Sequence, residues 1–260
     1  MNPRTDTPAT QAPSDLDRWF RRYWPRPAAR RRIVLFPHGG GSASFYRGLA
    51  KRLLPAAEPL IAQYPGREDR LEERHITVMA ELADRACEAL LPALDREFVF
   101  FGHSMGAAVA HEVALRLEHR HGVAPALLCL SGRPAPRHHK PGSKHLDDEA
   151  LWDELGRLGA TPSLLLANPQ VRRVVLPTLR ADYRLVERYR PGTSPMLSCP
   201  VAACLGDQDP EVTPQEAEAW SEVSRGGFTF RLFAGDHFFF RGQEDDLVGW
   251  LLTTTDREAA

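Results

Sequence analysis

Gly102-His103-Ser104-Met105-Gly106 is the stretch that decides the fold of this 260-residue chain. It follows an apolar run, residues 98–101, and precedes a stretch rich in Ala, Leu, Glu and Arg, residues 107–120. A G-x-S-x-G sequence between a strand and a helix is the pattern of a nucleophile elbow. Only glycine fits beside such a serine, because a Cβ would collide with neighbouring backbone. The pattern predicts that Ser104 begins a helix, where the amide of Met105 faces any oxyanion formed on a substrate.

An elbow serine needs a histidine base and a carboxylate that orients it, and in this architecture they follow in the order Ser, Asp or Glu, His. Of the ten histidines, only His237 lies beyond His145, so His237 is the predicted base. The carboxylate is expected in the loop after the apolar run 201–205, where Asp207 and Asp209 are both candidates. We favour Asp209, because it lies deeper in the loop, and keep Asp207 as the alternative.

A second oxyanion donor is expected from a loop after an earlier strand. The apolar run 32–36 is followed by a glycine-rich loop, residues 37–44, in which Gly39 is the predicted donor. The rival interpretation is a phosphate cradle at a helix N-terminus. It is disfavoured, because the loop lacks the G-x-x-x-x-G-K-[ST] pattern and no lysine occurs between Gly39 and Lys51.

Composition is that of an ordinary globular protein. Hydrophobic residues make up 43% of the chain, which suffices for a core, and the formal net charge is −1, so no global field would attract nucleic acid or membrane. The four cysteines lack metal-ligand spacing, and no metal site is expected. Residues 1–15 are predicted to be a disordered tail, neither signal peptide nor anchor. These features favour a cytoplasmic protein with no nucleic acid or membrane partner. A monomer is expected, since the sequence shows no coiled coil or obvious exposed strand edge that would demand an oligomer.

Short apolar runs alternate with helical stretches along the chain, which predicts an α/β fold with a doubly wound, mostly parallel sheet. The expected strands are residues 33–36, 60–64, 98–101, 127–131, 201–205 and 228–233. The expected helices around them are residues 45–54, 78–91, 105–120, 214–223 and 244–252. The serine, aspartate and histidine candidates all follow strand ends, where open α/β sheets place their sites.

About seventy residues separate the fourth expected strand from the fifth, far more than one crossover needs. We interpret residues 137–193 as an inserted helical lid, and residues 16–260 as a single domain that carries it. Helices are expected at residues 147–158, 163–167 and 169–189, with Pro177 starting a new helix inside the last. The apolar residues of this lid are expected to cover the site: Leu164, Leu165, Leu166, Val171, Val174, Val175, Leu179, Leu185 and Val186. The alternative is a structural subdomain that does not contact substrate.

Short motifs spread along residues 19–252 resemble those of the stand-alone type II thioesterases that accompany polyketide synthases and nonribosomal peptide synthetases. They are Trp19-Phe20-Arg21-Arg22 with Pro25-Arg26-Pro27, Phe36-Pro37-His38-Gly39-Gly40-Gly41-Ser42-Ala43, Tyr64-Pro65-Gly66-Arg67-Glu68-Asp69-Arg70, the elbow with Ala107, Ser131-Gly132-Arg133-Pro134-Ala135-Pro136, Leu179-Arg180-Ala181-Asp182-Tyr183, and Gly235-Asp236-His237-Phe238-Phe239. Ser104, Asp209 and His237 fall where the triad of this family falls. Gly39 stands where we would expect Ala in many relatives. This departure does not remove the expected donor, because glycine also supplies a backbone amide.

The resemblance implies the α/β-hydrolase fold and an editing thioesterase. Such an enzyme releases stalled acyl groups from the phosphopantetheine arm of acyl or peptidyl carrier proteins, and it needs no cofactor of its own. Carrier domains tend to be acidic around the arm, so the basic stretch after residue 131 is a candidate docking site: Arg133, Arg137, His138, His139, Lys140 and Lys144. Two alternatives remain, a carboxylester hydrolase acting on free esters and a non-catalytic α/β-hydrolase scaffold.

Overall fold

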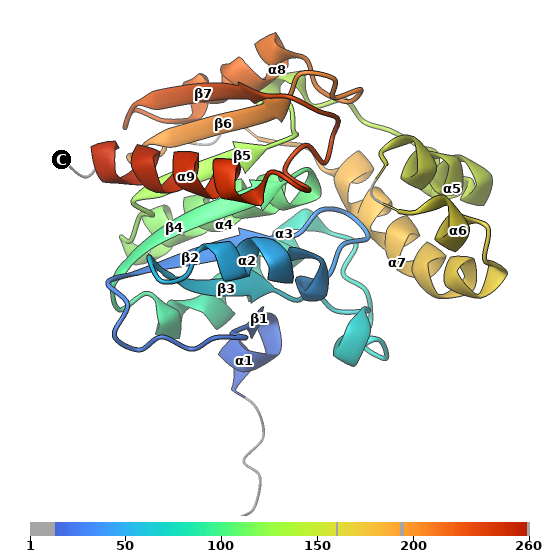
Figure 1. Ribbon diagram of the computed structural model, residues 1–260, viewed down its shortest axis with the longest axis horizontal. Coiled ribbons are helices and arrows are strands. Elements are labelled where there is room, and N and C mark those ends of the chain that lie inside the picture. Colours follow the sequence, from blue (N-terminus) through green and yellow to red (C-terminus); the bar gives the residue numbers. More distant parts are fainter. Residues whose placement is uncertain (1–13, 160, 193–194, 259–260) are drawn as a thin grey trace, which may run out of the picture.

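A mostly parallel sheet forms the centre of the computed structural model, which describes residues 14–159, 161–192 and 195–258 (Figure 1). Its strands are β1 (Phe20–Arg21), β2 (Arg31–Phe36), β3 (Glu58–Ala62), β4 (Glu97–His103), β5 (Leu127–Ser131), β6 (Val201–Gly206) and β7 (Phe228–Phe233). Their spatial order is β1-β3-β2-β4-β5-β6-β7, and only the β1–β3 pair is antiparallel. All six expected strands are present, although β3 begins and ends two residues earlier than expected. The two-residue edge strand β1 was not predicted.

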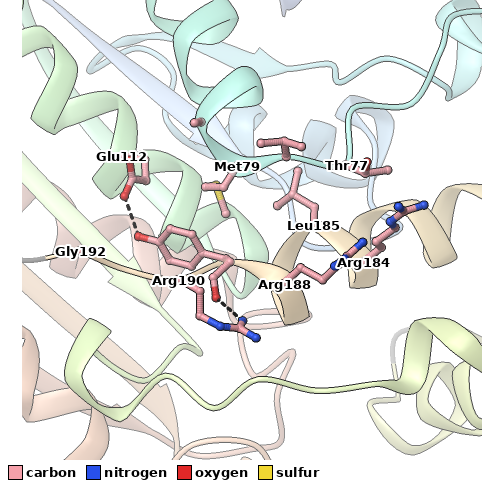
Figure 2. Close-up of a pocket in the computed structure, with 11 residues that line it drawn as sticks. Thr77, Met79, Glu112, Arg184, Leu185, Arg188, Arg190 and Gly192 are labelled. Atoms are coloured by element: carbon pink, nitrogen blue, oxygen red, sulfur yellow. Dashed lines mark hydrogen bonds between the residues drawn. The ribbon is translucent and has the colours of Figure 1, made fainter.

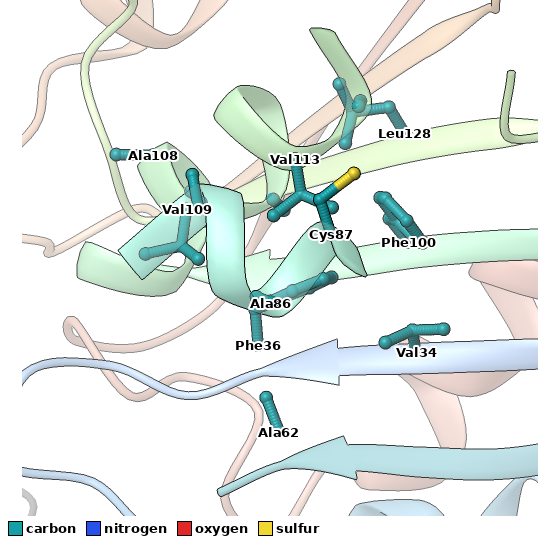
Figure 3. Packing of buried hydrophobic residues seen from close by; sticks show 14 of the residues in the cluster. Val34, Phe36, Ala62, Ala86, Cys87, Phe100, Ala108, Val109, Val113 and Leu128 are labelled. Carbon is teal, nitrogen blue, oxygen red and sulfur yellow. The ribbon is translucent and has the colours of Figure 1, made fainter. Parts of the chain in front are cut away.

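Helices cover both faces of the sheet, which confirms the doubly wound prediction. The helices of this part are α1 (Asp15–Trp19), α2 (Arg47–Arg52), α3 (Met79–Leu90), α4 (Met105–His121), α8 (Pro214–Glu218) and α9 (Glu244–Glu258). Figure 1 shows α2 and α9 on one face and α3 and α4 on the other. Alternate residues of β2 enter different cores: Val34 and Phe36 pack with α3 and α4 (Figure 3), whereas Ile33 and Leu35 pack with α2 and α9.

Between β5 and β6 the described residues include three further α-helices, which form what we call the helical insertion. They are α5 (Asp148–Arg157), α6 (Ser163–Leu166) and α7 (Pro169–Arg188). In Figure 1 they lie beyond the carboxyl ends of the strands. A small core of their own holds them together, built around the buried side chains of Leu151, Trp152, Leu176 and Leu179.

Two expectations about the insertion were wrong. Pro177 does not start a new helix, because α7 runs continuously through it. Packing on both sides of the proline holds the helix together: Leu176 and Leu179 are buried, and Thr178 Oγ1 donates a hydrogen bond to the carbonyl of Gly66. The second wrong expectation is that all of the apolar residues named for the lid cover the site. Leu164, Leu165 and Val174 are 85%, 46% and 58% exposed, since they lie on the outer sides of α6 and α7.

Of the expected N-terminal tail, residues 1–13 lie outside the described residues. Ser14 and Asp15 belong to a helix instead, since Ser14 caps α1 with its hydroxyl and Asp15 begins it. Among the helices that the structure describes, none combines the length and the apolar character needed to cross a membrane.

Candidate active site

The elbow at Ser104 joins β4 to α4 through a backbone conformation that side chains rarely adopt. Ser104 has φ 55° and ψ −118°, and its amide donates to the carbonyl of Ser131 at 2.8 Å. A Cβ on Gly102 would lie 2.3 Å from the carbonyl oxygen of Gly106, and one on Gly106 would lie 1.9 Å from that of Phe36. The steric argument for both glycines is therefore confirmed. The strain at Ser104 is of the kind that folds maintain at functional sites.

His237 and Asp209 come together from two neighbouring loops. His237 follows β7 and Asp209 follows β6, and the Nδ1 atom of His237 lies 2.8 Å from Oδ2 of Asp209. Both side chains are almost completely buried, with exposed fractions of 2% and 0%. Asp207, the alternative carboxylate, forms no hydrogen bond or ion pair with His237. Its Oδ1 accepts a hydrogen bond from the amide of Gly235 at 2.9 Å, so it holds the loop in which His237 lies.

The second ring nitrogen of His237 faces no partner. Nε2 is buried and makes no hydrogen bond with any residue that the structure describes. Ser104 and His237 line one cavity of about 280 Å³. An imidazole that donates its Nδ1 proton to a carboxylate keeps Nε2 free to accept a proton. The geometry can thus support proton transfer from a hydroxyl in this cavity.

The glycine-rich loop after β2 reaches the same cavity. Gly39 lines it, and a Cβ built on Gly39 would lie 3.9 Å from Cβ of Met105. The backbone of Gly39 therefore runs beside the first residue of α4, whose amide has no partner within the helix. Two backbone amides from separate elements close to Ser104 are the ingredients of an oxyanion hole.

Buried histidines surround the site, and only His237 was assigned a catalytic part from the sequence. His38 lies in the glycine-rich loop after β2, and His103 belongs to the elbow motif itself. Burial lowers the pKa of His103 well below its usual value, and it lowers the pKa of His38 to about 3. His103 packs against His237 with ring centroids 4.8 Å apart. His103 and His38 are therefore neutral at pH 7 and add no charge beside His237.

Acid is expected to destabilise the fold through such histidines. Burial lowers the pKa of His111 to about 4, and that of His38 to about 3, against about 6.5 in an unfolded chain. Below pH 6.5 these histidines bind protons in the unfolded state but not in the native state. The free energy of unfolding therefore decreases as the pH falls toward the native-state pKa values. Each histidine should cost roughly 1 kcal/mol per pH unit between about pH 6 and pH 4. Urea unfolding at several pH values would measure the slope, and His111→Phe should make it shallower. An unchanged slope would contradict the prediction.

The helical insertion lines the cavity together with the core. Leu155 of α5 and Leu179, Tyr183 and Val186 of α7 line the same cavity as Ser104. The insertion thus borders the cavity that Ser104 lines rather than lying apart from it.

A parallel sheet, a serine in a strained elbow, and a histidine held by an aspartate on adjacent loops define an enzyme of the α/β-hydrolase class. The comparisons with known proteins specify the family. Residues 31–253 match the model described as "Thioesterase domain". The chain is 43% identical over 240 residues to a probable cadicidin biosynthesis thioesterase of Streptomyces griseus, and the match covers 92% of this chain and 66% of that protein.

It is 41% identical over 238 residues to thioesterase PikA5 of Streptomyces venezuelae, with 90% of this chain and 85% of that one covered. Among solved structures, the type II thioesterase BorB from the borrelidin biosynthetic cluster superposes with a TM-score of 0.85 at 40% identity, covering 94% of this chain and 100% of that one. The chain belongs to the thioesterase family, and the resemblance to type II thioesterases is confirmed.

Proposed function

We propose that this thioesterase hydrolyses stalled acyl groups from the phosphopantetheine arm of carrier proteins in a polyketide or nonribosomal peptide assembly line. The observation that carries the proposal is the cavity in which Ser104, His237 and Gly39 meet beneath the helical insertion. The family and the biosynthetic origin of its relatives, cited above, supply the substrate class. The four cysteines of the chain are free thiols, which supports action in a reducing compartment such as the cytoplasm.

The reaction follows from the arrangement of the side chains. Nε2 of His237 takes the Ser104 proton as Oγ attacks the thioester carbonyl, and Asp209 orients and stabilises the resulting imidazolium. The amides of Met105 and Gly39 stabilise the oxyanion, each by about 3 kcal/mol. The C–S bond breaks, and His237 returns the proton to the departing thiolate. Water, deprotonated by His237, then cleaves the acyl-serine, and Ser104 regains its proton.

In this proposal the helical insertion acts as a lid. Its apolar side chains line the same cavity as Ser104, where they can pack against an acyl chain and limit the access of water before attack. A purely structural subdomain would have no reason to line this cavity.

The rival activity is hydrolysis of free carboxylic esters, which needs the same triad. The two are separated by release of a short acyl group from a phosphopantetheinylated carrier, measured by mass spectrometry beside an oxygen ester of the same acid. A higher kcat/KM for the acyl-carrier is expected. Cleavage of the ester alone would leave the fold and triad in place but overturn the carrier substrate.

The basic stretch after β5 is a poor docking surface in the folded protein, because glutamates of the same protein form ion pairs with most of its cations. Arg137 pairs with Glu222 at 2.6 Å, Lys140 with Glu216 at 3.1 Å, and Lys144 with Glu154 at 2.6 Å. The remaining strong cation, Arg133, is half-buried and donates to His139.

Helix α7 offers cations that are still available. Arg184 and Arg188 are exposed and one turn apart, and neither forms an ion pair with the residues that the structure describes. Together with Arg190 they line two surface hollows. The first, of about 470 Å³, is shown in Figure 2, and the second has a volume of about 540 Å³. The second hollow shares Gly142 with the cavity that contains Ser104. We therefore place the acidic face of the carrier on α7.

Charge reversal at these two positions is expected to weaken carrier docking. Arg184→Glu with Arg188→Glu should raise KM for the acyl-carrier at least about tenfold at low salt, because unpaired charges at an interface act on encounter and salt dependence. KM for a small acyl-pantetheine thioester should not change. Arg225→Glu, an exposed arginine elsewhere, is the matched control. An effect of Arg137→Glu but not of the α7 variant would return docking to the loop after β5.

A further inference from the structure

A buried ion pair joins the helical insertion to the core beside the glycine-rich loop. Arg67 lies in the loop after β3 and Asp182 lies in α7, 115 residues apart in the sequence. Nη1 and Nη2 of Arg67 each lie 2.8 Å from a carboxylate oxygen of Asp182. The two side chains are only 7% and 3% exposed. Two parallel hydrogen bonds of this kind fix orientation as well as distance.

The same two side chains also hold the glycine loop. The amide of Gly40 donates to Oδ2 of Asp182 at 2.7 Å, and Nη1 of Arg67 donates to the carbonyl of Gly41 at 2.8 Å. The backbone between these glycines is thus anchored at both ends by one ion pair. Gly39 directly precedes Gly40 in the chain and also lies close to Asp182, since a Cβ built on Gly39 would lie 3.6 Å from Cβ of Asp182.

Such anchoring matters because the loop itself supplies little to fix these glycines beyond one turn hydrogen bond, from the amide of Gly41 to the carbonyl of His38 at 2.9 Å. Three consecutive glycines have no side chains to pack and a wide choice of backbone angles, and Gly40 indeed has φ +76°. An oxyanion donor, by contrast, is effective only when it is held in place before the charge develops. A buried ion pair is weak evidence of stability in itself, since apolar residues of similar size often serve as well. What an apolar pair could not supply here is the acceptor for Gly40 and the donor for Gly41.

We propose that Asp182 and Arg67 are positioning residues that aim the amide of Gly39 at the oxyanion, so that the chemical step requires the helical insertion to be seated on the core. The proposal rests on the proposed function in one respect, since it takes Gly39 as the oxyanion donor. A second contact ties the same elements together, because Thr178 of α7 donates to the carbonyl of Gly66, next to Arg67. Substrate entry and oxyanion stabilisation would then depend on the same helix.

Asp182→Asn tests the proposal against Glu154→Gln as the matched control. Glu154 is also a buried carboxylate of the insertion, paired with Lys144 and Arg157, but it does not contact the glycine loop. With a small thioester or ester substrate, Asp182→Asn should lower kcat about tenfold to a hundredfold with KM nearly unchanged. It should weaken inhibition by a trifluoromethyl ketone, whose adduct places an oxyanion in the hole, by the same factor. Both substitutions remove a charge from a buried ion pair, so both should lower Tm. Glu154→Gln should nevertheless leave kcat and the inhibition unchanged.

Equal losses of kcat in the two variants, or a normal kcat in Asp182→Asn, would overturn the proposal. If Asp182→Asn does not fold, Arg67→Lys replaces it, since lysine keeps the charge but cannot bridge both carboxylate oxygens and Gly41. An enzyme that cleaves esters but not acyl-carriers would refute the proposed substrate. It would still test Asp182 through the kcat for the ester, so the two failures are distinguishable.

Discussion

Ser104→Ala is expected to lower kcat for thioester hydrolysis by at least about 10⁴-fold, because the reaction then loses its nucleophile. The variant should fold normally. The Ser104 hydroxyl makes no hydrogen bond within the described chain, and alanine has the same backbone requirement at φ 55°. Stopped-flow or discontinuous assays of acyl release would measure the rate, with thermal unfolding to verify the fold.

Labelling by a fluorophosphonate probe is the control for this variant. The wild type should react and Ser104→Ala should not. A variant that keeps more than about a tenth of wild-type activity would place the nucleophile elsewhere. A wild type that neither reacts with the probe nor turns over would favour the non-catalytic scaffold, the alternative that the sequence left open.

Asp209→Asn is expected to lower kcat by about 10³-fold to 10⁴-fold, the size of effect seen when an orienting aspartate is replaced by its amide. An asparagine at this position can present its NH₂ group to Nδ1 of His237, which would favour the wrong imidazole tautomer. The carboxylate is completely buried and lies 2.8 Å from the ring, so water cannot replace it.

Asp207→Asn is the matched control, two residues away in the same loop. Among the described residues, the side chain of Asp207 accepts a hydrogen bond from the backbone amide of Gly235 alone, and an amide oxygen can accept it as well. Its kcat should stay within about threefold of the wild type. The steady-state kinetics of the two variants, measured together, assign the carboxylate. A larger loss in Asp207→Asn than in Asp209→Asn would reverse the assignment.

The strand-helix alternation and the elbow were readable from the sequence because both depend on local patterns. Apolar runs mark buried parallel strands, and glycines at fixed offsets mark a turn that tolerates no Cβ. The order Ser, Asp, His limited the base to His237. It could not choose between Asp207 and Asp209, because both follow β6, and only the three-dimensional path of the loop decides which carboxylate meets the ring.

Contacts between distant segments could not be read in this way. The motifs containing Arg67 and Asp182 were both noticed, but nothing in either motif says that these two residues, 115 positions apart, meet at Gly40. The prediction for Pro177 failed for a related reason, since the packing of α7 on α5 and on the Gly66 loop overrides a local rule about proline. Ion pairing likewise neutralises the basic stretch that looked exposed in the sequence.

The most direct test of the central claim, that Ser104 accepts the acyl group from a carrier arm, is a rapid-quench experiment with peptide mapping. The wild type would be mixed with a carrier bearing an isotopically labelled short acyl group, quenched in acid within milliseconds, digested and analysed by mass spectrometry. We predict a transient acyl mass shift on the peptide that contains Ser104, followed by release of the free acid. Acid release without any adduct on that peptide, or an adduct on another residue, would contradict the account.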